Sequence, residues 1–171
     1  MTSTDGAPSI PEYLIAQGVQ VEPVEPGSAG APEVSIAVPA GWQQVPPGMF
    51  PGSYGVWTTP PADGWADNAV LLVAKFSQTV DPRGLLTCAF TDARRLPEWT
   101  DQGTDDEDFQ GFPSAGITGT YVVAPQTLWA YNRYTIVTHG ADQFLVQLTV
   151  TIRDDHDGAD AATIIQGLKV S

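Results

Sequence analysis

The segment that decides the fold is Phe144-Leu145-Val146-Gln147-Leu148-Thr149-Val150-Thr151-Ile152. In an extended chain, side chains alternate between the two faces. One face would carry Phe144, Val146, Leu148, Val150 and Ile152, and the other, apart from Leu145, would carry Gln147, Thr149 and Thr151. This pattern predicts a strand whose one face is mainly core. The preceding apolar segment, Leu128–Val137, is joined to it by the short connection Thr138–Gln143, which makes the two strands antiparallel neighbours.

Further strands are predicted on both sides of this pair. Three consecutive strands are expected between Asp108 and Ile152, separated from the upstream part by an acidic loop at Asp101–Asp108. The nearly continuous apolar run Ala69–Phe76 is typical of a central strand covered on both faces. Shorter strands are expected at Val34–Val38 and about Tyr54–Thr58.

Three helices are predicted from capping residues and apolar spacing. Ser9 can cap a short first helix that Gly18 ends. Asp81-Pro82 is a strong helix start, and that helix should end before Pro97. Asp157 can cap a final helix with an apolar stripe.

These elements predict the α+β class: an antiparallel β-sheet sandwiched by helices, in a single domain over residues 1–171. We expect residues 1–8 to be flexible and residues 19–32 to form an extended connection.

Composition excludes several classes of partner. The chain has a formal charge of −13 and only seven Lys and Arg residues among 171. Nucleic acid and direct binding to an anionic membrane are therefore not expected, because both attract positive charge. No apolar run approaches the ~20 residues that a spanning helix needs. The sequence leaves the oligomeric state open.

The chain shows no equipment for catalysis. Cys88 is the single cysteine and reads as a small core residue, while His139 and His156 lie in predicted turns. The run Asp154–Asp160 resembles a calcium loop superficially, but it lacks the alternating oxygen ligands and the closing Glu. We predict no catalytic residue, no metal site and no cofactor, and hence no enzyme.

The region between residues 49 and 65 is rich in aromatic side chains among repeated Pro and Gly. Trp and Tyr bury a large area while keeping a polar handle, and loops that display them over a sheet often bind apolar ligands. The same rings could instead close the edge of the sheet. The predicted ligand-binding residues are Met49, Phe50, Tyr54, Trp57 and Trp65. We expect a binding module for an apolar or amphipathic small molecule or a protein segment; the alternative is a cytoplasmic chaperone or adaptor that shields an apolar helix of a client protein.

Five short motifs occur in order along nearly the whole chain: Ile10-Pro11-Glu12-Tyr13-Leu14, Pro39-Ala40-Gly41-Trp42, Asp67-Asn68-Ala69-Val70, Leu96-Pro97-Glu98-Trp99, and Gly111-Phe112-Pro113 with Gly119-Thr120-Tyr121. Together with the element order, they resemble the LpqN family of actinobacterial, chiefly mycobacterial, probable lipoproteins, whose fold is similar to the PsbP and Mog proteins. The resemblance brings no catalytic residues. It implies a non-enzymatic role in the cell envelope or in protein interaction.

The chain departs from that family at its N-terminus. Lipoproteins of the family begin with a signal peptide and a lipid-modified Cys, whereas the first residues here, Met1-Thr2-Ser3-Thr4-Asp5-Gly6, show neither. Leu85-Leu86-Thr87-Cys88 is only faintly similar to a lipobox and lies deep in the domain. The prediction is therefore a cytoplasmic protein, with an exported, cell-envelope location as the alternative if a leader precedes Met1 in the native gene.

Overall fold

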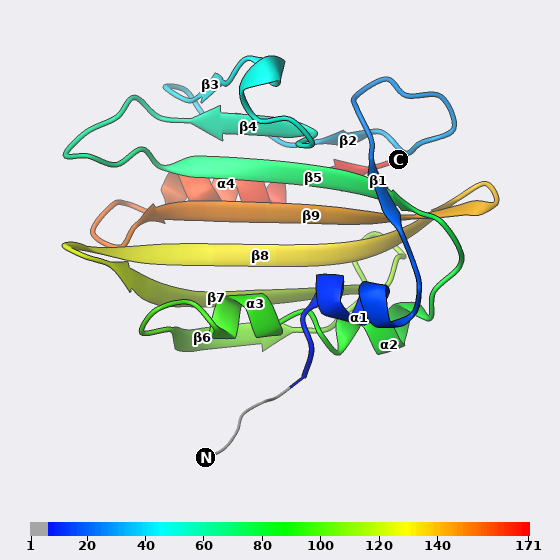
Figure 1. The fold of residues 1–171 in the computed structure, drawn as a ribbon. Helices are drawn as coiled ribbons and strands as arrows, with labels where there is room; N and C mark the ends of the chain where they lie inside the picture. Colours follow the sequence, from blue (N-terminus) through cyan, green and yellow to red (C-terminus); the bar gives the residue numbers. More distant parts are fainter. Residues whose placement is uncertain (1–6) are drawn as a thin grey trace.

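A computed structural model of the chain describes residues 7–171, and most of the predicted flexible segment 1–8 lies outside them. The main sheet has eight strands (Figure 1). Seven of them follow the order β3-β4-β5-β9-β8-β7-β6, and the eighth, β1, pairs with β5 along the same edge as β4. Its strands are β1 (Val21–Pro23), β3 (Gln43–Gln44), β4 (Gly55–Thr58), β5 (Asn68–Phe76), β6 (Thr100–Asp105), β7 (Ser114–Val123), β8 (Gln126–His139) and β9 (Asp142–Arg153). A second sheet pairs β2 (Val34–Ser35) with β10 (Lys169–Val170). The helices are α1 (Ile10–Ala16), η1 (Pro47–Met49), α2 (Pro82–Leu86), α3 (Thr91–Arg94) and α4 (Ala159–Gln166).

All strand pairs are antiparallel, which confirms the predicted sheet type. The hairpin of β8 and β9 closes through Gly140-Ala141, and Gly140 has a φ of 65°. Glycine adopts that left-handed conformation without the cost that a Cβ would add. The α+β sandwich is thus the observed class.

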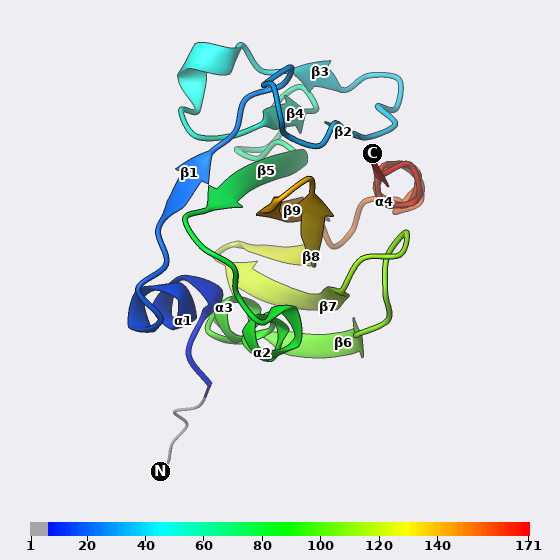
Figure 2. The same ribbon diagram turned by 90° about the vertical axis from the view of Figure 1, so that its right-hand side faces the viewer.

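One face of the sheet carries the larger core, which lies under α4 and the β2–β10 pair (Figure 2). The apolar face predicted for β9 points here, and Phe144, Leu148 and Val150 are each at most 1% exposed. Ile164 of α4 packs into the same core. The apolar face of β9 is thereby removed from water, and such burial of apolar area is the main favourable term in folding.

The opposite face carries a second core, which lies under α1 and α2. Ile10 and Leu14 of α1 pack there with Leu85 of α2 and with Cys88, which is 3% exposed. The assignment of Cys88 as a core residue is therefore confirmed. The start of α1 is also as predicted, because the side chains of Ser9 and Glu12 form a reciprocal capping box.

Several local predictions were wrong. The single helix expected between Asp81 and Pro97 is divided into α2 and α3, and the Asp81 side chain makes no capping hydrogen bond. Residues 101–105 of the expected acidic loop instead form, with Thr100, an edge strand, β6, in which Asp101 and Asp105 form ion pairs with Arg94 and Arg133. Gly158, rather than Asp157, is the N-cap of α4, although the Asp157 carboxylate accepts a hydrogen bond from the Ala159 amide at 2.9 Å.

Three further features of the strands differ from the prediction. The strand expected at Val34–Val38 is β2, which is only two residues long and belongs to the small sheet. The three-strand segment begins at Ser114, and the connection 19–32 contains β1.

The helices leave part of the second face uncovered. In Figure 1, α1, α2 and α3 lie at the β6–β7 end of the sheet, while β4, β5 and β9 have no helix in front of them and η1 lies beyond β4. This uncovered part of the sheet bears the candidate site.

Candidate ligand-binding site

An apolar groove of about 630 Å³ lies on the uncovered face beside η1. Val56 of β4 and Val70 and Leu72 of β5 form its floor, and Met49 and Phe50 line its wall. Val56 and Val70 are register partners, so their side chains share a face of the sheet. Two polar side chains, Thr58 and Asn68, lie at one end. Ligand pockets commonly have about this volume and this mixture of apolar walls with few polar groups.

The wall of the groove belongs to a segment that we call the strap, residues 46–53. The strap is anchored at both ends, where the Val45 amide donates to the Val56 carbonyl and the Tyr54 amide donates to the Leu71 carbonyl, each at 2.8 Å. Between these anchors, the strap's hydrogen bonds within the described residues are all internal. Met49 is 66% exposed and Phe50 51% exposed. The strap therefore presents two large apolar side chains to solvent at the edge of an apolar groove.

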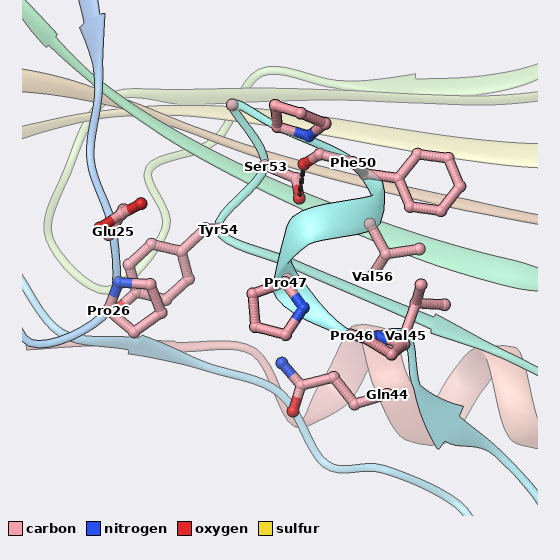
Figure 3. A pocket seen from close by; sticks show the side chains of 13 residues that line it. Glu25, Pro26, Gln44, Val45, Pro46, Pro47, Phe50, Ser53, Tyr54 and Val56 are labelled. Carbon is pink, nitrogen blue, oxygen red and sulfur yellow. Dashed lines mark hydrogen bonds between the residues drawn. The ribbon is translucent and has the colours of Figure 1, made fainter.

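A second hollow, of about 360 Å³, lies on the other side of the strap (Figure 3). Glu25, Gln44 and Tyr54 contribute to its lining, and Phe50, Ser53 and Val56 belong to both hollows. In Figure 3 the Phe50 ring points away from Glu25 and Tyr54. The strap is thus a shared wall between a mainly apolar groove and a more polar hollow.

The structure does not bring the five predicted ligand-binding residues into one site. Met49 and Phe50 line the groove. Tyr54 lines the second hollow and packs against the larger core. Trp57 pairs with Ala69 and packs on that same core, on the face opposite the groove. Trp65 lies in the β4–β5 connection, where its indole N–H donates to Asp67 at 2.9 Å.

Val56, Val70 and Leu72 were not predicted as site residues. Val70 and Leu72 are half-buried, whereas Ala69 and Leu71, their neighbours on the other face, are completely buried. The sequence shows only a continuous apolar run in β5, so it gives no sign that one of its faces remains partly open.

A polar cluster occupies the end of the sheet near Trp65. The Asp67 carboxylate is buried and accepts hydrogen bonds from the Trp65 indole and from the Arg153 amide, the latter at 3.0 Å. It also shares a hydrogen bond with His156 Nδ1 at 2.6 Å. Buried polar groups need such partners, and the cluster therefore joins the β4–β5 connection to the segment before α4.

Arg133 of β8 forms a second polar cluster near β6, the edge strand of the sheet. Its guanidinium donates to Tyr131 Oη at 2.6 Å, Ser114 Oγ at 2.8 Å and Asp105 Oδ2 at 2.9 Å. A hydrogen bond from the Glu107 amide, together with the Arg133 contact, holds the pKa of the Asp105 carboxyl below its ordinary value. This arrangement fixes β6 and the following loop to β8.

Among residues 7–171, no group of three or more His, Cys, Asp or Glu side chains is placed to hold a metal ion. None of the helices in that range has the length and apolar character needed to cross a bilayer.

Solved structures with the same architecture identify the fold type. LpqN from Mycobacterium tuberculosis superposes with a TM-score of 0.84 at 21% sequence identity, covering 95% of this chain and 97% of that structure. Cyanobacterial PsbP from Synechocystis superposes with a TM-score of 0.50 at 12% identity over 85% of this chain and 95% of that structure. The chain therefore has a PsbP-like α+β fold.

Sequence comparison identifies the family. The family model described as "Probable lipoprotein LpqN" matches residues 7–171, and the chain belongs to this family. The proline-rich 28 kDa antigen homolog of Mycobacterium leprae is 31% identical over 95% of this chain and 60% of its own length. LpqT of Mycobacterium tuberculosis, named as a lipoprotein, is 31% identical over 99% of this chain and 76% of its own length. The chain thus spans little more than half of the proline-rich antigens, which are 53–60% covered.

The prediction of a cytoplasmic location is wrong. Relatives of this chain are named lipoproteins, and these names point to an exported, cell-envelope location. The prediction rested on the first residues of the sequence, which do not decide where the family acts.

Proposed function

We propose that this chain is a non-enzymatic binding module of the cell envelope that holds an apolar or amphipathic small molecule in the groove beside the strap. The observation that carries the proposal is the groove itself, whose apolar floor lies open next to the exposed side chains of Met49 and Phe50. A soluble domain rarely leaves large apolar side chains clustered at a hollow unless they serve binding.

The residue types at the wall suit this role. Methionine is flexible and polarizable and adapts to differently shaped apolar partners, while phenylalanine contributes a large flat area. Thr58 and Asn68 offer uncharged hydrogen-bonding groups at one end. These features favour a ligand with an apolar body and a neutral polar end.

The electrostatics favour the same class of ligand. The groove lining contains no charged side chain, and the chain as a whole carries a net charge of −13. An anionic ligand would be repelled by this field, while an uncharged one would not. The relatives support the envelope setting, since M. tuberculosis LpqN is described as involved in cell envelope biogenesis. The relatives do not belong to known enzyme families, which supports the non-enzymatic part of the proposal.

Binding of Nile red, an uncharged apolar dye whose fluorescence rises in apolar surroundings, tests the proposal. We expect saturable binding to the wild type, and Phe50→Ala should weaken it by about 2 kcal/mol, roughly 30-fold in Kd, as for a truncated anchoring ring. Ile15→Ala is the matched control, because Ile15 is 77% exposed but lies on α1, away from the groove. Equal affinity of all three proteins would refute the groove as the binding site.

A further inference from the structure

The hollow on the far side of the strap has a chemistry different from that of the groove. Its lining carries one formally charged side chain, Glu25, together with the Tyr54 ring and four prolines. The prolines are Pro26, Pro46, Pro47 and Pro51. Among the described residues, the Glu25 carboxylate has no ion-pair partner. A carboxylate without an ion-pair partner thus lies at a hollow whose other walls are the Tyr54 ring, proline rings and the uncharged side chains of Gln44 and Ser53.

The fold fixes the backbone at Glu25 and the ring of Tyr54 in this hollow. Immediately before Glu25, the amide of the buried residue Val24 donates to the Val73 carbonyl at 2.8 Å. Ser28 closes the following turn, donating from its amide and its hydroxyl to the Glu25 carbonyl. Tyr54 is fixed from both ends, since its amide bonds to Leu71 and its hydroxyl accepts a hydrogen bond from the Val34 amide at 3.3 Å. The Tyr54 ring is therefore positioned before any ligand arrives, which lowers the entropy cost of binding.

A carboxylate beside an aromatic ring and apolar walls suits an organic cation. The ring attracts a cation through its quadrupole, the carboxylate through its charge, and the proline rings can contact the methylene or methyl groups that surround the charge. Inorganic cations do not fit this description, because they require several oxygen ligands. The excess of 20 acidic over seven basic residues draws cations toward the molecule as a whole.

We propose that the hollow between Glu25 and Tyr54 binds an alkylammonium or guanidinium group, supplied either by a free organic amine or by a Lys or Arg side chain of a protein. This site is independent of the apolar groove, although the two share the strap as a wall.

Choline and its uncharged isostere 3,3-dimethyl-1-butanol provide the direct test at low salt, where charge interactions are least screened. Amide NMR shifts of Gln44 and Gly55, which line this hollow and not the groove, report occupancy. Choline should shift these amides saturably and the isostere should not. N-acetyl-lysine amide and N-acetyl-arginine amide form the second arm. Tighter binding of either than of choline assigns the cation to a protein side chain, and the reverse order assigns it to a free amine.

Two pairs of variants separate a local site from a general field. Glu25→Gln should raise the Kd of the tighter-binding cation about fivefold, as expected for a partly exposed ion pair, while Glu33→Gln should leave it unchanged because Glu33 is exposed outside the hollow. Tyr54→Phe should retain binding and Tyr54→Leu should weaken it. Equal shifts with choline and its isostere, no saturable shift with any cation, or equal effects of the two Glu variants would overturn the proposal. Nile red binding in the groove is measured with different residues and a different probe, so the two proposals can fail separately.

Discussion

At the scale of single residues, the face of the sheet that a side chain occupies decides its role. Val56 and Trp57 are adjacent in β4, yet Val56 lines the groove and Trp57 packs against the larger core. The sequence drew attention to the aromatic-rich region, but it could not show which face of the sheet each side chain occupies there. The repeated Pro and Gly of residues 46–55 hide the strand register, and only the pairing of β4 with β5 sets it.

Trp57→Ala should lower stability without weakening Nile red binding. Trp57 is half-buried, so its truncation should cost about 2 kcal/mol and lower the Tm by roughly 4–8 °C in a domain of this size. Thermal unfolding and dye titration should distinguish the two variants: Trp57→Ala should lower the Tm and keep the dye affinity, whereas Phe50→Ala should lower the dye affinity and keep the Tm. Loss of dye affinity in Trp57→Ala with an unchanged Tm would instead support the prediction that Trp57 binds ligand.

Acid should weaken the Arg133 cluster. Because the folded-state pKa of Asp105 lies below its unfolded value, the stability that this carboxylate contributes is present above about pH 4 and is lost as the pH falls further. Asp105→Asn should therefore flatten the decline in unfolding free energy between about pH 5 and pH 3. Urea unfolding across this pH range provides the measurement. A slope identical to that of the wild type would mean that Asp105 does not titrate differently in the folded state.

At the scale of elements, those with strong local rules were predictable. The capping box of α1 and the alternation of β9 appear in the structure as the sequence indicates. β6 could not be recognised, because its residues are polar or glycine and lie exposed, and Asp side chains are unfavourable in strands. It exists because β7 offers a free edge and Arg94 and Arg133 pair with Asp101 and Asp105.

Ser9→Ala should destabilise the chain by about 1 kcal/mol, since it removes the acceptor for the Glu12 amide at the start of α1. α1 buries Ile10 and Leu14 in the second core, so loosening of its first turn should also reach the global unfolding transition. Denaturant unfolding measures the loss, and faster hydrogen exchange confined to the α1 amides would locate it. No change in either quantity would show that the capping box contributes nothing.

Gly119→Ala should destabilise the β6–β7 pair. A Cβ at residue 119 would collide with the Trp99 ring and with the Thr100 carbonyl oxygen, and overpacking of this kind costs about 1–3 kcal/mol. Gly48→Ala is the matched control, because a Cβ there meets no atom within 4 Å. Thermal unfolding should separate the two variants, and equal melting temperatures would show that Trp99 and the β6 backbone can both move aside at no cost.

At the scale of the whole molecule, the antiparallel sheet with helices on both faces could be predicted, because each strand and helix pattern states which face must be buried. The groove could not. It arises where the strap, β4 and β5 meet on a part of the sheet that the short helices α1–α3 do not reach. Its floor and wall come from residues 49–72, and whether their apolar faces are covered depends on the lengths and positions of helices elsewhere in the chain.

The proposed groove can be observed directly through its methyl groups. In a protein with ¹³C-labelled Met, Val, Leu and Ile methyls, titration with Nile red should shift the signals of Met49, Val70 and Leu72, with Ile15 on α1 unaffected. These three side chains come from the wall and the floor, so their joint response places the dye between the strap and β5. Shifts confined to residues outside the groove, or saturable dye binding with no shift of these three methyls, would show that the ligand site lies elsewhere on the molecule.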